Sequence, residues 1–165
     1  MSFSLLPSVR LKAVTDITAE MLQKRNIQLL MLDFDNTIVP YTTDIPTKEV
    51  LGWIHKMQSA DISICVVSNS HNQRVQKFCS KYGLDCITHA GKPFSDGICR
   101  CLKKYGTAPE NSALAGDQIF TDTLGANCAG VLSILVCAID NHNIWLKLRH
   151  VAELPFIFAA RKRRF

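Results

Sequence analysis

The rest of this chain is arranged around one stretch, Leu29-Leu30-Met31-Leu32-Asp33-Phe34-Asp35-Asn36-Thr37. Its four leading apolar residues predict a short strand that is buried on both faces, as strands of parallel sheets are. Two carboxylates, Asp33 and Asp35, follow the apolar run directly. Because neighbouring carboxylates repel each other, their closeness is less costly when a cation lies beside them. The stretch therefore predicts a strand with a cation-assisted site at its carboxyl end.

Apolar runs and helical patterns alternate along the rest of the sequence. Further strands are predicted at residues 62–67, 85–88, 112–115 and 131–136, and helices at residues 19–24, from Thr47 onward, and at 72–81, 94–105 and 119–129. This alternation favours an α/β fold, a Rossmann-like doubly wound sheet of about five parallel strands with helices on both faces. We expect a single domain over residues 1–165, with residues 1–17 as an extended segment across the core.

Composition limits the class of protein. Hydrophobic residues make up 47% of the 165 residues and charged residues 20%, which is typical of a globular domain. The net charge of +5 favours anionic partners, namely phosphate esters, nucleic acid or acidic lipid, although it also simply promotes solubility. The seven cysteines show no pairs at metal-ligand spacing, so we expect buried free thiols in a reducing cytosol. No signal-peptide pattern and no apolar stretch of the ~20 residues that span a bilayer is present, so we expect a cytoplasmic protein, at most attached to the inner face of a membrane.

Polar residues follow several predicted strands at the edge where parallel sheets bind ligands. Ser68, Lys92 and Asp117 come after the second, third and fourth predicted strands, as Asp33 comes after the first. Asp33 fits the nucleophile of a phosphoryl transfer, and Asp35 a general acid that protonates the leaving oxygen and then deprotonates water. Ser68 fits a hydrogen-bond donor to a phosphate oxygen, and Lys92 a cation that stabilises the transferring charge.

The same carboxylates predict a magnesium site. Asp117 can join Asp33 and the backbone carbonyl of Asp35 in holding Mg²⁺, which prefers oxygen ligands. Asp122 follows Asp117 by five residues and can support the metal-bound waters or the lysine. Each residue alone also has a structural interpretation, since serine and threonine favour turns and aspartate caps helices. Their order on alternating strands favours one shared site.

The chain resembles the haloacid dehalogenase (HAD) superfamily of phosphatases over about residues 28 to 137. The segments similar to the four motifs of the family are Asp33-Phe34-Asp35-Asn36-Thr37, Val67-Ser68-Asn69, Lys92-Pro93 and Gly116-Asp117-Gln118 with Asp122. The resemblance extends to the capless subfamily IIIA and its phosphatidylglycerophosphatase-like branch. It implies magnesium, an aspartyl-phosphate intermediate, a phospholipid precursor as substrate, and phosphate-binding roles for Thr37, Ser68, Asn69 and Lys92.

Spacing independently predicts that no lid domain covers the site. Ser68 follows Asp33 by 35 residues and Lys92 follows Ser68 by 24, and predicted helices and strands fill both intervals. An open site suits a substrate that brings its own cover, such as a bilayer, a protein or a nucleic acid. The tail has an apolar segment at residues 154–158 and a basic one at 161–164, which favours peripheral contact with an anionic membrane over nucleic acid. For the tail taken by itself, packing on the domain with a solvated basic end is the favoured interpretation.

The leading hypothesis is a magnesium-dependent phosphomonoesterase that acts on phosphatidylglycerophosphate. The same chemistry on a sugar phosphate, a nucleotide or a polynucleotide end remains an alternative. A third hypothesis is a receiver-type domain that stores a phosphoryl group on aspartate. Asp35 argues against storage, because an acid beside the nucleophile promotes the attack of water.

Overall fold

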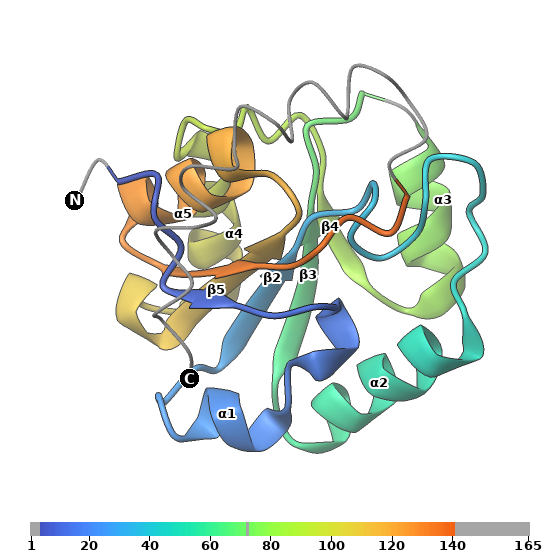
Figure 1. The fold of residues 1–165 in the computed structure, drawn as a ribbon, viewed down its shortest axis with the longest axis horizontal. Helices are drawn as coiled ribbons and strands as arrows, with labels where there is room; N and C mark the ends of the chain where they lie inside the picture. Colours follow the sequence, from blue (N-terminus) through green and yellow to red (C-terminus); the bar gives the residue numbers. More distant parts are fainter. Residues whose placement is uncertain (1–3, 72, 141–165) are drawn as a thin grey trace.

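Six parallel strands form the single sheet of the computed structural model, which describes residues 4–71 and 73–140 (Figure 1). Their order is β1-β6-β5-β2-β3-β4. The strands are β1 (Val9–Arg10), β2 (Leu29–Leu32), β3 (Ser63–Val67), β4 (Asp85–Ile87), β5 (Ser112–Gly116) and β6 (Leu132–Leu135). The predicted parallel α/β fold is confirmed. The predicted number of strands was one too low, because β1 is too short to show a hydrophobic pattern.

Helices connect successive strands. They are α1 (Ala19–Gln23), α2 (Lys48–Ser59), α3 (Gln73–Tyr82), α4 (Asp96–Tyr105) and α5 (Leu124–Ala129), with the short turns η1 (Val14–Asp16), η2 (Pro109–Asn111) and η3 (Ile119–Thr123). The predicted helix at 119–129 is in fact two elements, because η3 is a π-helical turn that precedes α5. Both Asp122 and Thr123 donate their backbone N–H groups to the carbonyl of Gln118, which widens this turn.

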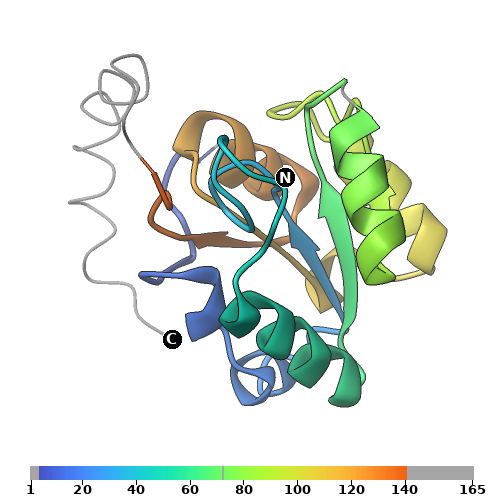
Figure 2. The same ribbon diagram turned by 90° about the vertical axis from the view of Figure 1, so that its right-hand side faces the viewer.

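Alternate residues of β2 face two separate hydrophobic cores. Leu30 and Leu32 pack in the core that contains the buried residues of α2 and α3. Leu29 and Met31 pack in the core that contains those of α4 and α5. Figures 1 and 2 show these helices packed around the strands. The prediction of helices on both faces is therefore confirmed.

The carboxyl ends of the strands are left without a separate cap. The long loop at residues 33–47 and α2 connect β2 to β3, and α3 is the helix between β3 and β4. Within residues 4–71 and 73–140, no further domain is inserted between these elements. In that part of the chain, none of the helices combines the length and the apolar character needed to traverse a bilayer. The apolar and basic tail segments at 154–164 lie outside the described residues, so their contact with lipid stays a prediction.

All seven cysteines lie in the described part of the chain and are free thiols. Cys65, Cys79 and Cys101 are buried, as expected, whereas Cys99 and Cys137 are exposed. Neither exposed cysteine belongs to a possible metal site, since the only cluster among the described residues that could hold a metal is made of aspartates.

Candidate active site

A tight turn after β2 places the first two acids. The pairing with β5 continues past the strand end, because Asp33 donates its N–H to the carbonyl of Ala115 at 2.9 Å. Asn36 has a φ of 64°, a left-handed conformation that asparagine tolerates better than most residues. Its N–H donates to the carbonyl of Val39 at 2.7 Å, and its side-chain amide donates to the carbonyl of Asp140 at 2.6 Å. These bonds hold the turn between β2 and the chain that follows β6.

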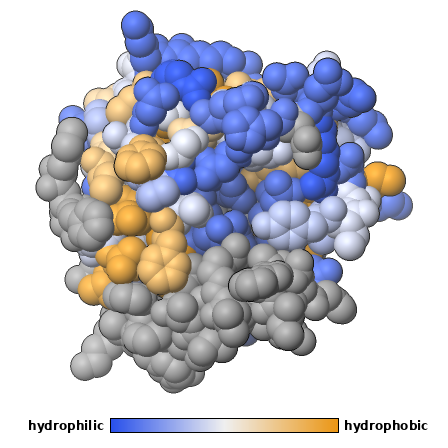
Figure 3. Space-filling model, turned by 90° about the horizontal axis from the view of Figure 1, so that it is seen from above, coloured by the Kyte–Doolittle hydropathy of each residue, from blue (hydrophilic) through white to orange (hydrophobic). Residues whose placement is uncertain are grey.

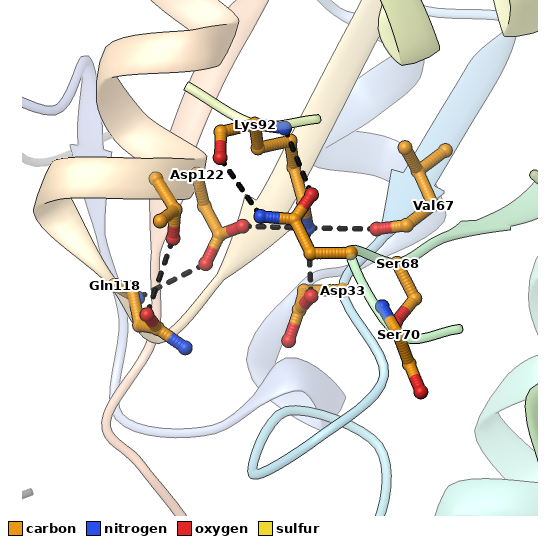
Figure 4. A network of polar contacts seen from close by, with 9 residues as sticks. Asp33, Val67, Ser68, Ser70, Lys92, Gln118 and Asp122 are labelled. Atoms are coloured by element: carbon orange, nitrogen blue, oxygen red, sulfur yellow. Dashed lines mark hydrogen bonds and ion pairs between the residues drawn. The ribbon is translucent and has the colours of Figure 1, made fainter. Parts of the chain in front are cut away.

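Lys92 lies at the centre of the buried part of the site (Figure 4). Its Nζ is 2.6 Å from Oδ1 of Asp33 and 2.7 Å from Oδ1 of Asp122, and it donates to the carbonyl of Val67 at 2.7 Å. We call Asp33, Lys92 and Asp122 the floor cluster. The ammonium group thus donates two hydrogen bonds, to Asp33 and to a backbone carbonyl, and pairs with the charge of Asp122, which offsets part of the cost of burying this cation.

The backbone of Lys92 is held by a side chain from the neighbouring loop. Asn69 accepts the Lys92 N–H on Oδ1 and donates from Nδ2 to the Lys92 carbonyl, both at 2.8 Å. The Lys92–Pro93 peptide bond in this segment is cis. The side chain of Asn69 therefore positions the lysine, and its expected contact with phosphate stays a prediction.

Asp122 reaches the floor cluster because Gly116 has no side chain. A Cβ atom on Gly116 would lie 2.4 Å from both Cγ and Oδ2 of Asp122, closer than atoms can approach. Oδ2 of Asp122 also accepts the backbone N–H of Gln118 at 3.1 Å. The expected support of Lys92 by Asp122 is thus a direct ion pair in the structure.

Carboxylates of the site are grouped closely enough to hold a divalent cation. Asp33, Asp117 and Asp122 each offer an oxygen within 4.8 Å of the others. Both oxygens of Asp122 face protein groups, since Oδ1 forms an ion pair with Lys92 at 2.7 Å without hydrogen-bond geometry and Oδ2 accepts the Gln118 N–H. Oδ2 of Asp33 is buried with neither an ion pair nor a hydrogen bond among the described residues. Asp33 and Asp117 therefore fit an oxygen-ligated metal better than Asp122 does.

Asp35 belongs to a second group of charges at the mouth of the site. Its Oδ1 accepts a hydrogen bond of 2.5 Å from Nη1 of Arg74, and Arg74 also forms an ion pair with Asp44. We call Asp35, Arg74 and Asp44 the rim cluster. The carboxylate of Asp35 is not among those grouped around a metal position, and only its backbone carbonyl stays a candidate ligand. Sequence reasoning missed Arg74, since a single arginine at a helix start resembles any surface charge.

The two hydroxyl residues of the site are both buried. Ser68 is 2% exposed, and its Oγ accepts the N–H of Ser70 at 3.0 Å, which leaves its proton for another acceptor (Figure 4). Thr37 is also 2% exposed, and its Oγ1 has no hydrogen-bond partner among the described residues. Ser68 comes directly after β3, and Thr37 lies in the loop after β2. Both hydroxyl groups are therefore at the edge of the sheet where phosphate contact was expected.

Burial and neighbouring charge set the protonation of these groups. Burial raises the pKa of Asp33 to about 7, an effect that Lys92 opposes and Asp122 reinforces. Burial alone would lower the pKa of Lys92, but attraction by Asp122 and Asp33 outweighs it and raises this pKa. Burial also raises the pKa of Asp35, with Arg74 acting against the rise. Lys92 is therefore a permanent cation, and additional positive charge beside Asp33 would favour its carboxylate form.

Sequence relatives of this chain are phosphatases. Residues 2–138 match the model of a family described as "Mitochondrial PGP phosphatase". The "Probable phosphatase YqeG" of Bacillus subtilis is 33% identical over 131 residues, which cover 79% of this chain and 76% of that protein.

Solved structures with the same fold include phosphatases. The cobalt-bound deoxy-D-mannose-octulosonate 8-phosphate phosphatase YrbI of Haemophilus influenzae superposes with a TM-score of 0.54 at 13% identity, over 84% of this chain and 92% of that chain. The corresponding phosphatase of Moraxella catarrhalis, solved with a magnesium ion, a phosphate ion and KDO, has a TM-score of 0.51 at 15% identity, over 89% of this chain and 95% of that chain. The family match over residues 2–138 shows, as predicted, that this chain is a phosphatase and belongs to the PGP phosphatase family.

Proposed function

We propose that this phosphatase hydrolyses phosphatidylglycerophosphate with the help of Mg²⁺ and through an aspartyl phosphate on Asp33. One observation carries the chemical part of the proposal. Asp33 is 6% exposed, with one oxygen 2.6 Å from the Lys92 ammonium and the other without a hydrogen-bond partner in the described structure. A carboxylate held in this way has one oxygen free to attack and a fixed cation beside it.

The proposed reaction has two steps. A carboxylate oxygen of Asp33 attacks phosphorus, the bond from phosphorus to the alcohol oxygen breaks, and Asp35 donates a proton to the leaving oxygen. Asp35 then accepts a proton from water, whose oxygen attacks phosphorus and releases inorganic phosphate and the Asp33 carboxylate. Lys92 stabilises the negative charge near Asp33 in both steps, and the hydroxyl groups of Ser68 and Thr37 are proposed to donate to phosphate oxygens.

The proposed metal ligands are all oxygens. The carboxylates of Asp33 and Asp117 and the backbone carbonyl of Asp35 would hold Mg²⁺, which prefers such a donor set. When bound, the ion supplies positive charge that neutralises the phosphate group during transfer. Asp122 would act on this site through Lys92, to which it is paired at 2.7 Å.

The lipid substrate is supported by the family description and by the surface around the site. Among the described residues, four large apolar side chains are exposed, and all of them lie on loops that follow the carboxyl ends of strands: Tyr41, Ile45, Phe94 and Ile139. Figure 3 looks onto this edge and shows a largely hydrophilic described surface, with apolar side chains gathered on its left side. An open polar site with exposed apolar side chains on the neighbouring loops suits a phosphate that projects from a bilayer. We propose that the tail at 154–164 adds contact with anionic lipid.

Phosphate release from two kinds of substrate tests this function. The enzyme would be given phosphatidylglycerophosphate in vesicles and, separately, a panel of soluble sugar phosphates, nucleotides and phosphorylated oligonucleotide ends. Each reaction would be run with Mg²⁺ and with a chelator. We expect magnesium-dependent release that is fastest from the lipid. Faster turnover of a soluble ester would overturn the lipid substrate, and equal rates in the chelator would overturn the metal requirement.

A further inference from the structure

Arg74 binds the loop after β2 at two separate places. At the start of the loop, its Nη1 donates to Oδ1 of Asp35 at 2.5 Å. At the far end, its Nη2 donates to the carbonyl of Thr43 at 2.7 Å and to that of Pro40 at 3.0 Å, and its Nε pairs with Asp44. All three nitrogens of the guanidinium group are thus directed at one loop. A single side chain from α3 ties the acid Asp35 to the segment that closes the loop.

The guanidinium group is itself held in place by an aromatic ring of the hydrophobic core. It lies 5.0 Å from the ring centroid of Phe34, a cation–π contact. Phe34 is fully buried and packs edge-on against Phe78 of α3, with ring centroids 5.0 Å apart. The hydrophobic core therefore restricts the position of the Arg74 guanidinium group, and the hydrogen bond from Arg74 restricts the orientation of the Asp35 carboxylate.

This arrangement distinguishes the two oxygens of Asp35. Oδ1 is occupied by Arg74, whereas the described structure contains no partner for Oδ2. A general acid must present its proton within hydrogen-bond reach of the leaving oxygen, and a small misplacement lowers the rate strongly. With Oδ1 bound, Oδ2 is the oxygen that can exchange a proton with the substrate.

We propose that Arg74 is the positioning residue for Asp35, fixing the orientation in which this acid meets the leaving group. The inference rests on the proposed function, because it assigns Asp35 the proton transfer. The side chain of Arg74 is 22% exposed, so water screens its ion pairs more than it screens those of a fully buried cation. Replacing Arg74 should therefore lower kcat/KM for substrates whose leaving group needs a proton more than it lowers the free energy of unfolding.

Two substrates with different leaving groups separate positioning from a general structural effect. An alkyl phosphate needs a proton on its leaving oxygen, whereas p-nitrophenyl phosphate releases a stable phenolate without one. For Arg74→Gln we expect kcat/KM to fall about 10- to 100-fold with the alkyl ester and less than about threefold with the aryl ester. Arg74→Lys, which keeps the charge but not the planar fork, should give an intermediate loss with the alkyl ester. Lys77→Gln removes an exposed cation from the same helix and is the matched control, with both values unchanged.

A double mutant then tests whether Arg74 acts through Asp35. In an Asp35→Asn background, Arg74→Gln should cause little further loss with the alkyl ester, because the acid is already absent. Equal losses with both esters in Arg74→Gln and in Arg74→Lys, or a full additional loss in the double mutant, would overturn the inference. Neither result would affect the proposed function, which fails instead if the wild-type enzyme releases no phosphate from phosphatidylglycerophosphate.

Discussion

The floor cluster and the rim cluster each place one cation between two aspartates, yet they differ in exposure to water. The side chain of Lys92 is 1% exposed, whereas that of Arg74 is 22% exposed. Charges removed from water interact strongly, and the loss of one partner leaves the other charge uncompensated. Charges near water interact weakly, so such a pair adds little to the free energy of unfolding. Its contribution is to fix the orientation of the paired side chains. We propose that the floor cluster supports both the fold and phosphoryl transfer, and that the rim cluster directs the proton transfers of Asp35.

The largest expected difference between the clusters is in turnover. Asp33→Asn removes the nucleophile and should lower kcat by at least about a thousandfold while the fold stays intact. Asp35→Asn removes only the proton transfer and should lower kcat by about 10²- to 10⁴-fold, with the smaller loss for good leaving groups. Phosphate release measured beside circular dichroism spectra checks both variants. Substantial residual activity in Asp33→Asn would remove that residue from its role.

Stability should also separate the two cations. Lys92→Met leaves Asp33 and Asp122 buried without a counter-charge and should lower the free energy of unfolding by about 3 kcal/mol or more. Arg74→Met should change it by less than about 1 kcal/mol, because its partners can be solvated. Urea unfolding of the metal-free proteins measures both values. Equal losses would show that burial does not distinguish the clusters.

The magnesium requirement should depend on the side chain of Asp117 and not on that of Asp44 in the rim cluster. Asp117→Ala removes a proposed ligand and should raise the Mg²⁺ concentration for half-maximal activity by about tenfold or more. Asp44→Asn removes a similar charge from the rim cluster and should leave that concentration unchanged. Titration of activity with Mg²⁺ measures both, and an unchanged requirement in Asp117→Ala would contradict its assignment.

A smaller effect is expected in the pH dependence of stability without metal. The pKa of Asp33 is raised to about 7 in the folded protein, above the value of about 3.9 for an exposed aspartate. The folded state then binds this proton more tightly than the unfolded state, so stability from this group is present at low pH and is lost as pH rises toward 7. Melting temperatures in a chelator should therefore fall over this range in the wild-type protein and fall less in Asp33→Asn. An identical slope in both would contradict the raised pKa.

Local patterns predicted the fold and the floor cluster well. Buried parallel strands such as β2 are continuous apolar runs, and the polar residues that end them converge because parallel strands finish at one edge. Asp33, Lys92 and Asp122 could therefore be grouped before any coordinates were known, and the structure brings them into contact.

Features that depend on contacts across the fold could not be predicted in this way. Arg74 meets Asp35 across 39 residues of sequence, and no local pattern marks an arginine that will bind a distant loop. The two-residue strand β1 exists only through its pairing with β6. The two hydrogen bonds between the Asn69 side chain and the Lys92 backbone likewise depend on two loops meeting. The sequence alone could therefore not distinguish the side-chain amide of Asn69 from a ligand to phosphate.

Trapping of the covalent intermediate tests the role of Asp33 most directly. The enzyme would be mixed with radiolabelled phosphatidylglycerophosphate and Mg²⁺, quenched in acid during turnover, digested, and mapped by mass spectrometry. We predict phosphate on the peptide that contains Asp33, with none in Asp33→Asn. Turnover without any labelled aspartate, or with the label on another residue, would contradict the proposed mechanism.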